Sequence, residues 1–119
     1  MFQSFRDLTV WQEGMALAER VYLASEKLPR AEAFGITAQI RRAAVSIPSN
    51  VAEGKAVGGR AYLRHLRIAL GSEAELQTQI ELAYRLKMFD KADAEALLTH
   101  AGKVGRMLSG LLKSLARHV

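Results

Sequence analysis

The chain has 119 residues, half of them hydrophobic, which is enough for one buried core but not for two domains. It contains no cysteine, which excludes disulfides and thiolate metal sites and is compatible with a reducing cytosol. No apolar run reaches the roughly 20 residues that span a bilayer, and residues 1–7 are too polar for a signal peptide. We therefore expect a single cytoplasmic domain, residues 1–119, with no membrane partner.

The net charge of +5 is distributed unevenly along the chain. Positions 41–67 hold six lysines and arginines against one acid, Glu53, and positions 103–119 hold four with no acid. Clustered positive charge favours polyanions through counterion release, whereas a merely solvated surface is the alternative. The candidate nucleic-acid contacts are Lys55, Arg60, Arg64, Arg67, Lys103, Arg106, Lys113 and Arg117.

The first predicted helix runs from about Thr9 to Lys27, with Thr9 as its N-cap and Pro29 as the residue that ends it. Its apolar positions recur at helical spacing in two neighbouring rows. One row is Trp11, Met15, Ala18 and Tyr22, and the other is Val10, Leu17, Val21 and Leu28.

The second predicted helix covers about Ala33 to Lys55 and contains Pro48. We expect either a kink at this proline or a break after which Pro48 restarts the helix. The turn that follows is marked by Gly58 and Gly59.

A polar stripe lies beside the apolar row of this second helix. The stripe comprises Gln39, Arg42, Ser46, Asn50 and Glu53, and the apolar row comprises Ile36, Ile40, Ala43, Ile47 and Val51. Polar groups at the border of a core are partly desolvated and need partners. The stripe therefore predicts a defined polar contact.

The third predicted helix spans about Arg60 to Met88 and has two rows that look buried. The first is Tyr62, Leu66, Ala69, Leu76, Ile80 and Ala83; the second is His65, Ile68, Ser72, Glu75, Gln79, Leu82 and Leu86. Two occupied faces indicate a central helix, or one that packs on a neighbouring subunit. Gly71 in its interior suggests a close approach of another helix.

The fourth helix has the clearest pattern, with Asp90 as its N-cap and Asp93 in its first turn. Its apolar row is Ala94, Leu97, Ala101, Val104, Leu108, Leu111 and Leu115. Four helices with short connections predict an all-α fold, an antiparallel up-down-up-down four-helix bundle.

In that bundle, equal rise from a turn near Gly58 sets Arg42 opposite Ala74. Arg42 then meets Glu75, or Glu73 if the register slips. One interpretation is a structural polar network that fixes helix register; the alternative is contact with a ligand or nucleic acid. The proposed network comprises Gln39, Arg42, Ser46, Asn50, Glu53, Glu75 and Gln79.

No arrangement of residues typical of an active site is present. His65, His100 and His118 lack metal-ligand spacing, no glycine-rich phosphate loop exists, and no Glu-x-x-His pair suggests a di-iron centre. We therefore expect no enzyme activity, no cofactor and no bound metal.

Three motifs in order resemble the bacterial four-helix bundle proteins named after the 23S rRNA intervening sequence. They are Phe5-x-x-Leu8-x-Val10-Trp11-Gln12; Gln39-Ile40-Arg41-Arg42-Ala43-Ala44-Val45-Ser46-Ile47 followed by Asn50-Val51-Ala52-Glu53-Gly54; and Ile68-Ala69-x-Gly71-Ser72-x-x-Glu75-Leu76-x-Thr78-Gln79. The likeness covers almost the entire chain. Glu73 departs from it, because relatives mostly carry a small residue there, and Gly58-Gly59-Arg60-Ala61 replaces the usual turn before the third helix.

The resemblance implies a homo-oligomer, a pentamer in related bundles, with a basic surface. One related branch, the accessory variability protein of diversity-generating retroelements, works with a reverse transcriptase and binds nucleic acid. For this chain, a reverse transcriptase is expected as partner only where the gene neighbourhood supports it. Our interpretation is an oligomeric, non-enzymatic bundle that binds RNA or DNA with little sequence preference; the alternative is an oligomeric protein–protein interaction scaffold.

Overall fold

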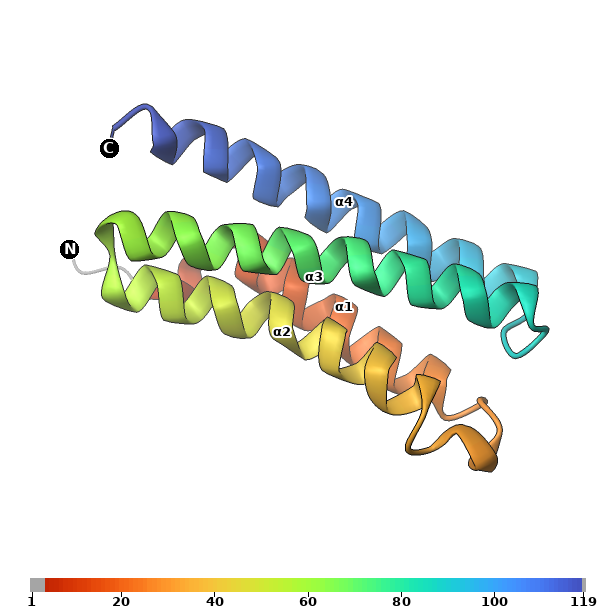
Figure 1. Cartoon of the computed structure of the whole chain (residues 1–119). Helices are drawn as coiled ribbons and strands as arrows, with labels where there is room; N and C mark the ends of the chain where they lie inside the picture. Colours follow the sequence, from red (N-terminus) through yellow and green to blue (C-terminus); the bar gives the residue numbers. More distant parts are fainter. Residues whose placement is uncertain (1–3, 119) are drawn as a thin grey trace.

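The computed structural model describes residues 4–118 and consists of helices, with no strand in that range. Consecutive long helices run in opposite directions and lie side by side in a bundle of 46 × 21 × 20 Å (Figure 1). This arrangement confirms the predicted all-α four-helix fold. The long helices are α1 (Thr9–Ser25), α2 (Ile36–Val57), α3 (Gly59–Arg85) and α4 (Lys91–Ala116); two short 3-10 helices are η1 (Phe5–Asp7) and η2 (Arg30–Glu32).

The predicted apolar rows form the core, except for the second row of α3, of which Ile68, Glu75, Leu82 and Leu86 are exposed. The α2 row is buried, as is the first row of α3, and the α4 row is buried from Ala94 to Leu108. Leu111 and Leu115, at the end of the α4 row, are only half-buried. In α1 the row that contains Leu17 is buried, whereas Met15 and Tyr22 of the other row are exposed. No helix within residues 4–118 is long and apolar enough to cross a membrane.

The ends of α1 differ from the prediction. Thr9 is the first residue of the helix rather than its cap, and Leu8 at the cap position makes no side-chain hydrogen bond. The capping side chain instead belongs to Ser4, which closes a capping box with Asp7 around η1. Because η1 leads directly into α1, Thr9 does not have to supply a cap.

Helix α2 runs without a break through Pro48, so the predicted restart at this residue was wrong (Figure 1). Pro48 is buried against Gly14 of α1, where an added Cβ on Gly14 would lie 3.5 Å from both Pro48 Cβ and Ile47 Cγ2. A proline removes one backbone donor from a helix. Packing of its ring in the core holds the helix together at this point.

The turn between α2 and α3 uses both predicted glycines, with φ of 80° at Gly58 and 59° at Gly59. Helix α3 ends at Arg85, earlier than predicted, because Lys87 adopts a left-handed φ of 64°. The Met88 amide donates to the Ala83 carbonyl (2.8 Å) and the Lys87 amide to the Tyr84 carbonyl (2.9 Å), which is a Schellman motif.

Asp90 caps α4 as predicted, since its Oδ1 accepts from the Asp93 amide at 2.7 Å. The expected close approach at Gly71 was wrong, because no atom lies within 4 Å of a Cβ added there. Close approaches occur instead at Gly54 and at Gly105. The Glu73 carboxylate fills the space beside Gly105, is buried, and accepts a hydrogen bond from Gln77.

Candidate nucleic-acid interface

The two basic clusters of the sequence approach one another at a single end of the bundle. The α2–α3 turn and the C-terminal end of α4 lie at the same end (Figure 1). Lys55 lies in the last turn of α2, Arg60 and Arg64 lie in the first two turns of α3, and Lys113 and Arg117 lie at the end of α4. We call these five residues the basic end.

Acidic side chains are sparse at the basic end. Glu53 lies in the last turns of α2, and Asp7 lies in η1, whose residues contact α2. Of the other candidate residues, Arg67 lies two turns into α3 and is exposed. Arg106 is exposed on α4.

Two of the eight candidate cations have partners among residues 4–118. Lys55 Nζ lies 5.9 Å from the centre of the Tyr62 ring, a cation–π contact. Tyr62 is itself buried, and burial raises the pKa of its phenol. Lys103 Nζ lies 3.4 Å from Glu13 Oε1, so this lysine is partly neutralised.

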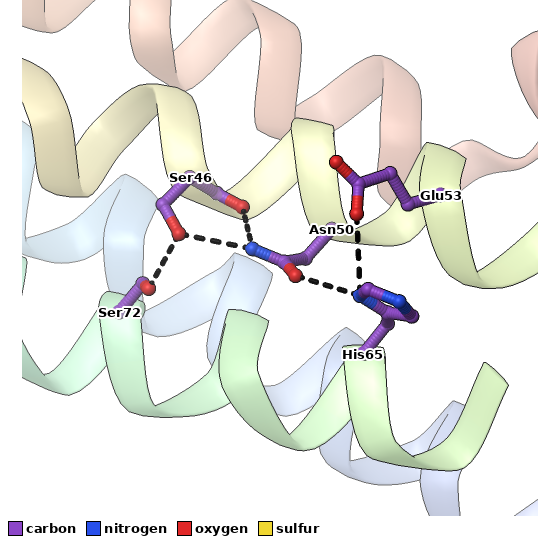
Figure 2. Close-up of polar contacts among 5 residues, drawn as sticks. All are labelled: Ser46, Asn50, Glu53, His65 and Ser72. Carbon is purple, nitrogen blue, oxygen red and sulfur yellow. Dashed lines mark hydrogen bonds and ion pairs between the residues drawn. The ribbon is translucent and has the colours of Figure 1, made fainter. Parts of the chain in front are cut away.

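A polar network joins α2 to α3 (Figure 2). Ser46 Oγ lies 2.8 Å from Ser72 Oγ, and Asn50 Nδ2 donates to the Ser46 carbonyl (2.9 Å) and to Ser46 Oγ (3.0 Å). His65 Nδ1 lies 2.9 Å from Asn50 Oδ1 and 3.6 Å from Glu53 Oε2. An amide oxygen only accepts, so Nδ1 carries the proton. The predicted stripe thus supplies Ser46, Asn50 and Glu53, while the partners from α3 were not predicted.

The remaining members of the predicted network lie outside it. Gln39, Arg42 and Glu75 are exposed, and no ion pair joins Arg42 to Glu75 among residues 4–118. The register of the two helices is the reason. The Ser46–Ser72 contact sets Arg42 level with the core residue Leu76 rather than with Glu75, and the side chains of Arg42 and Glu75 are both exposed. Gln79 is half-buried, and its Oε1 has no hydrogen-bond partner within the described part of the chain.

A second polar contact, between α1 and α4, was not predicted. His100 Nε2 lies 2.9 Å from Glu13 Oε1, and both side chains are largely buried. The His100 hydrogen bond, together with Lys103, lowers the pKa of Glu13 below its ordinary value of 4.5, against the opposing effect of burial. No spacing in the sequence connects residues this far apart.

Arg41 makes a third unpredicted contact, on the outer side of α1 and α2. Its Nε donates to Ser25 Oγ at 2.8 Å, and its guanidinium carbon lies 4.6 Å from the centre of the Tyr22 ring. Ser25 Oγ in turn donates to the Tyr22 carbonyl at 3.1 Å. The guanidinium is therefore held in one position.

The architecture and the motifs of this bundle agree with a known family. The model of the 23S rRNA-intervening sequence protein family matches residues 6–110. The chain belongs to this family. The match includes α1, α2 and α3 and most of α4.

A solved structure shares the fold of this chain. It is the crystal structure of a protein of unknown function from the S23 ribosomal protein family of Bacteroides thetaiotaomicron. The TM-score is 0.82 at 22% identity, with 88% of this chain and 99% of that chain covered. No protein with a curated description matches the chain.

Proposed function

We propose that this protein is a non-enzymatic, oligomeric bundle that binds RNA or DNA through its basic end, with little sequence preference. The observation that carries the proposal is that two clusters far apart in the sequence, 55–64 and 113–117, lie at one end of the fold (Figure 1). Such a charge distribution favours binding to the backbone phosphates of nucleic acids, which are the same whatever the base sequence.

The opposite end of the bundle supports the proposal by contrast. Acids and cations are mixed there, and Lys27 Nζ lies 2.8 Å from Asp93 Oδ2. Asp93 raises the pKa of Lys27 through this hydrogen bond and through the attraction between the two charges. A surface that carries charges of both signs does not attract a polyanion. The affinity for nucleic acid can therefore be compared between variants of this end and variants of the basic end.

The test compares two quadruple variants by fluorescence anisotropy with labelled RNA and DNA at several salt concentrations. The first replaces Lys55, Arg60, Arg64 and Arg67 by Gln, and the matched control replaces Arg30, Arg85, Lys87 and Lys91 by Gln. We expect the first to bind more weakly, with a salt slope reduced by up to about 0.9 for each duplex phosphate that the variant no longer neutralises. Circular dichroism should show unchanged helicity in both variants.

An equal weakening of binding in the two quadruple variants would contradict a localised interface. Unchanged binding in the first variant would contradict an interface built from both clusters and would leave only Lys103, Arg106, Lys113 and Arg117 as candidate contacts. Absence of binding by the parent protein at low salt would contradict the nucleic-acid proposal itself.

A protein–protein scaffold is the second candidate, favoured by an apolar groove of about 580 Å³ between α1 and α2. Trp11, Met15, Leu23, Val45 and Pro48 are among the residues that line it. A groove of this kind fits a second copy of the chain or another protein. A reverse transcriptase is proposed as that protein only where the gene stands beside one.

A further inference from the structure

A second hollow, of about 660 Å³, lies along the outer face of α2. The residues that matter to its chemistry are Tyr22, Phe34, Thr37, Arg41, Arg42 and Asn50. Among the described residues, no carboxylate lines this hollow. It therefore combines two guanidinium groups, two aromatic rings and hydrogen-bonding side chains without an opposing charge.

The two arginines of the hollow differ in how they are held. Arg41 is fixed by Ser25 Oγ and by the Tyr22 ring, and its Nη2 lies 3.5 Å from the Tyr22 carbonyl. A guanidinium has five N–H donors, so donors on Arg41 remain for a ligand after these contacts. Arg42, one residue further along α2, is exposed. The fixed guanidinium offers a face on which a base can stack, and the exposed one is suited to contacting a phosphate.

The aromatic side chains of the hollow are unusually accessible. Phe34 is 100% exposed and Tyr22 is 44% exposed. Neither ring stacks on another aromatic ring within residues 4–118. Exposed rings beside arginine are the pattern by which proteins stack unpaired bases.

We propose that this hollow binds an unpaired nucleotide of a single-stranded RNA or DNA. The base stacks on Phe34 or on the outer face of the Arg41 guanidinium, and Arg42 contacts the adjacent phosphate. A duplex does not fit this site, because its bases are stacked on one another and no base face is free to stack on a side chain. The inference rests on the proposed nucleic-acid function and adds to it the kind of strand that is bound.

The hollow is separate from the basic end, which allows the two to be tested independently. It is lined from the C-terminal half of α1, residues 33–34 and the first four turns of α2, whereas the basic end lies at the other end of α2. It adjoins the apolar groove and shares Tyr22, Val45 and Ser49 with it. Two arginines without a lining acid favour a nucleic acid over an apolar protein surface as the occupant.

The test measures the affinity of a labelled 12-nucleotide mixed-sequence single strand and of the corresponding duplex by anisotropy. We expect the parent protein to prefer the single strand. The double variant Phe34→Ala with Arg42→Gln should bind the single strand about 10-fold more weakly and the duplex within about twofold of the parent, since loss of a base-stacking contact lowers single-strand affinity by about this factor or more. Phe34→Tyr with Arg42 intact should retain the preference.

The matched control is Tyr84→Ala with Arg85→Gln, an exposed aromatic–arginine pair on α3 outside the hollow. It should leave single-strand affinity unchanged. Both altered pairs are exposed, so circular dichroism should match the parent.

Three outcomes would contradict the inference, and they are distinguishable. An unchanged single-strand affinity in the Phe34/Arg42 variant would overturn it and leave the proposed function standing. A changed molecular mass of that variant in light scattering would also overturn it, because the hollow would then be a subunit contact. Absence of binding to either probe by the parent would refute both proposals.

Discussion

A single residue, Gly54, decides how closely α2 and α3 approach each other next to the turn that connects them. A Cβ built on Gly54 would lie 2.9 Å from His65 Cβ, 3.0 Å from Tyr62 Cδ1 and 3.2 Å from the Tyr62 carbonyl oxygen. These atoms belong to the backbone or lie near it, so they do not move aside cheaply. The glycine therefore allows the approach that brings His65 within hydrogen-bond distance of Asn50.

We predict that Gly54→Ala destabilises the protein by about 1–3 kcal/mol, as overpacking of a tight contact does. The control is Gly14→Ala, whose Cβ would meet Ile47 and Pro48 at 3.5 Å, an ordinary van der Waals distance. That change should be neutral or stabilise by up to about 1 kcal/mol through helix propensity. Thermal melts of the two variants decide the matter: a Gly54→Ala melt at or above that of Gly14→Ala would be inconsistent with a close approach at Gly54.

At the scale of the elements, polar side chains connect neighbouring helices at defined positions. Glu13 on α1 contacts His100 and Lys103 on α4, the first and last of the long helices. The Ser46–Asn50–His65 contacts connect α2 to α3 in the same way (Figure 2). Contacts of this kind restrict the rotation of one helix against the next, since rotation would separate the hydrogen-bonded atoms.

The Glu13 contact predicts a specific pH dependence. The folded-state pKa of Glu13 is lowered, so its contribution to stability is present above the unfolded-state value, near 4.5, and is lost as the pH falls through the lower folded-state pKa. Glu13→Gln should therefore melt below the parent at pH 7, and the difference should shrink as the pH falls below 4.5. Glu19→Gln, an exposed carboxylate on the same helix, serves as control. A Glu13→Gln deficit that does not shrink at any pH below 4.5 at which both proteins stay folded would contradict the ionic account.

At the scale of the whole molecule, the chain leaves large apolar side chains uncovered on more than one face. The predicted second row of α3 includes Ile68, Leu82 and Leu86, which are 44%, 49% and 55% exposed. The α1–α2 groove adds Leu23 at 67%. Extended apolar surface on a domain of this size is typical of subunit interfaces.

We predict that light scattering at micromolar concentration gives several times the chain mass of 13.1 kDa, and five times by the family resemblance. Replacing Leu23 and Val45, which line the groove, by Glu should lower the mass without loss of helicity, because a charge cannot be buried there unpaired. Arg20→Glu, an exposed change on α1 outside the groove, is the control. A parent mass of one chain would contradict the oligomer.

The sequence by itself determined the fold class, the buried row of α2, the first row of α3, most of the α4 row and the Asp90 cap, because these follow from the local spacing of apolar residues and from a capping side chain next to the helix that it caps. It also located Ser46 and Asn50 at a polar border. Only the tertiary structure decided their partners, since the rotation of α3 about its axis selects His65 and Ser72 and leaves Glu75 in solvent. The two basic clusters lie at one end because the helices alternate in direction, which follows once the predicted helices fold into the antiparallel bundle (Figure 1).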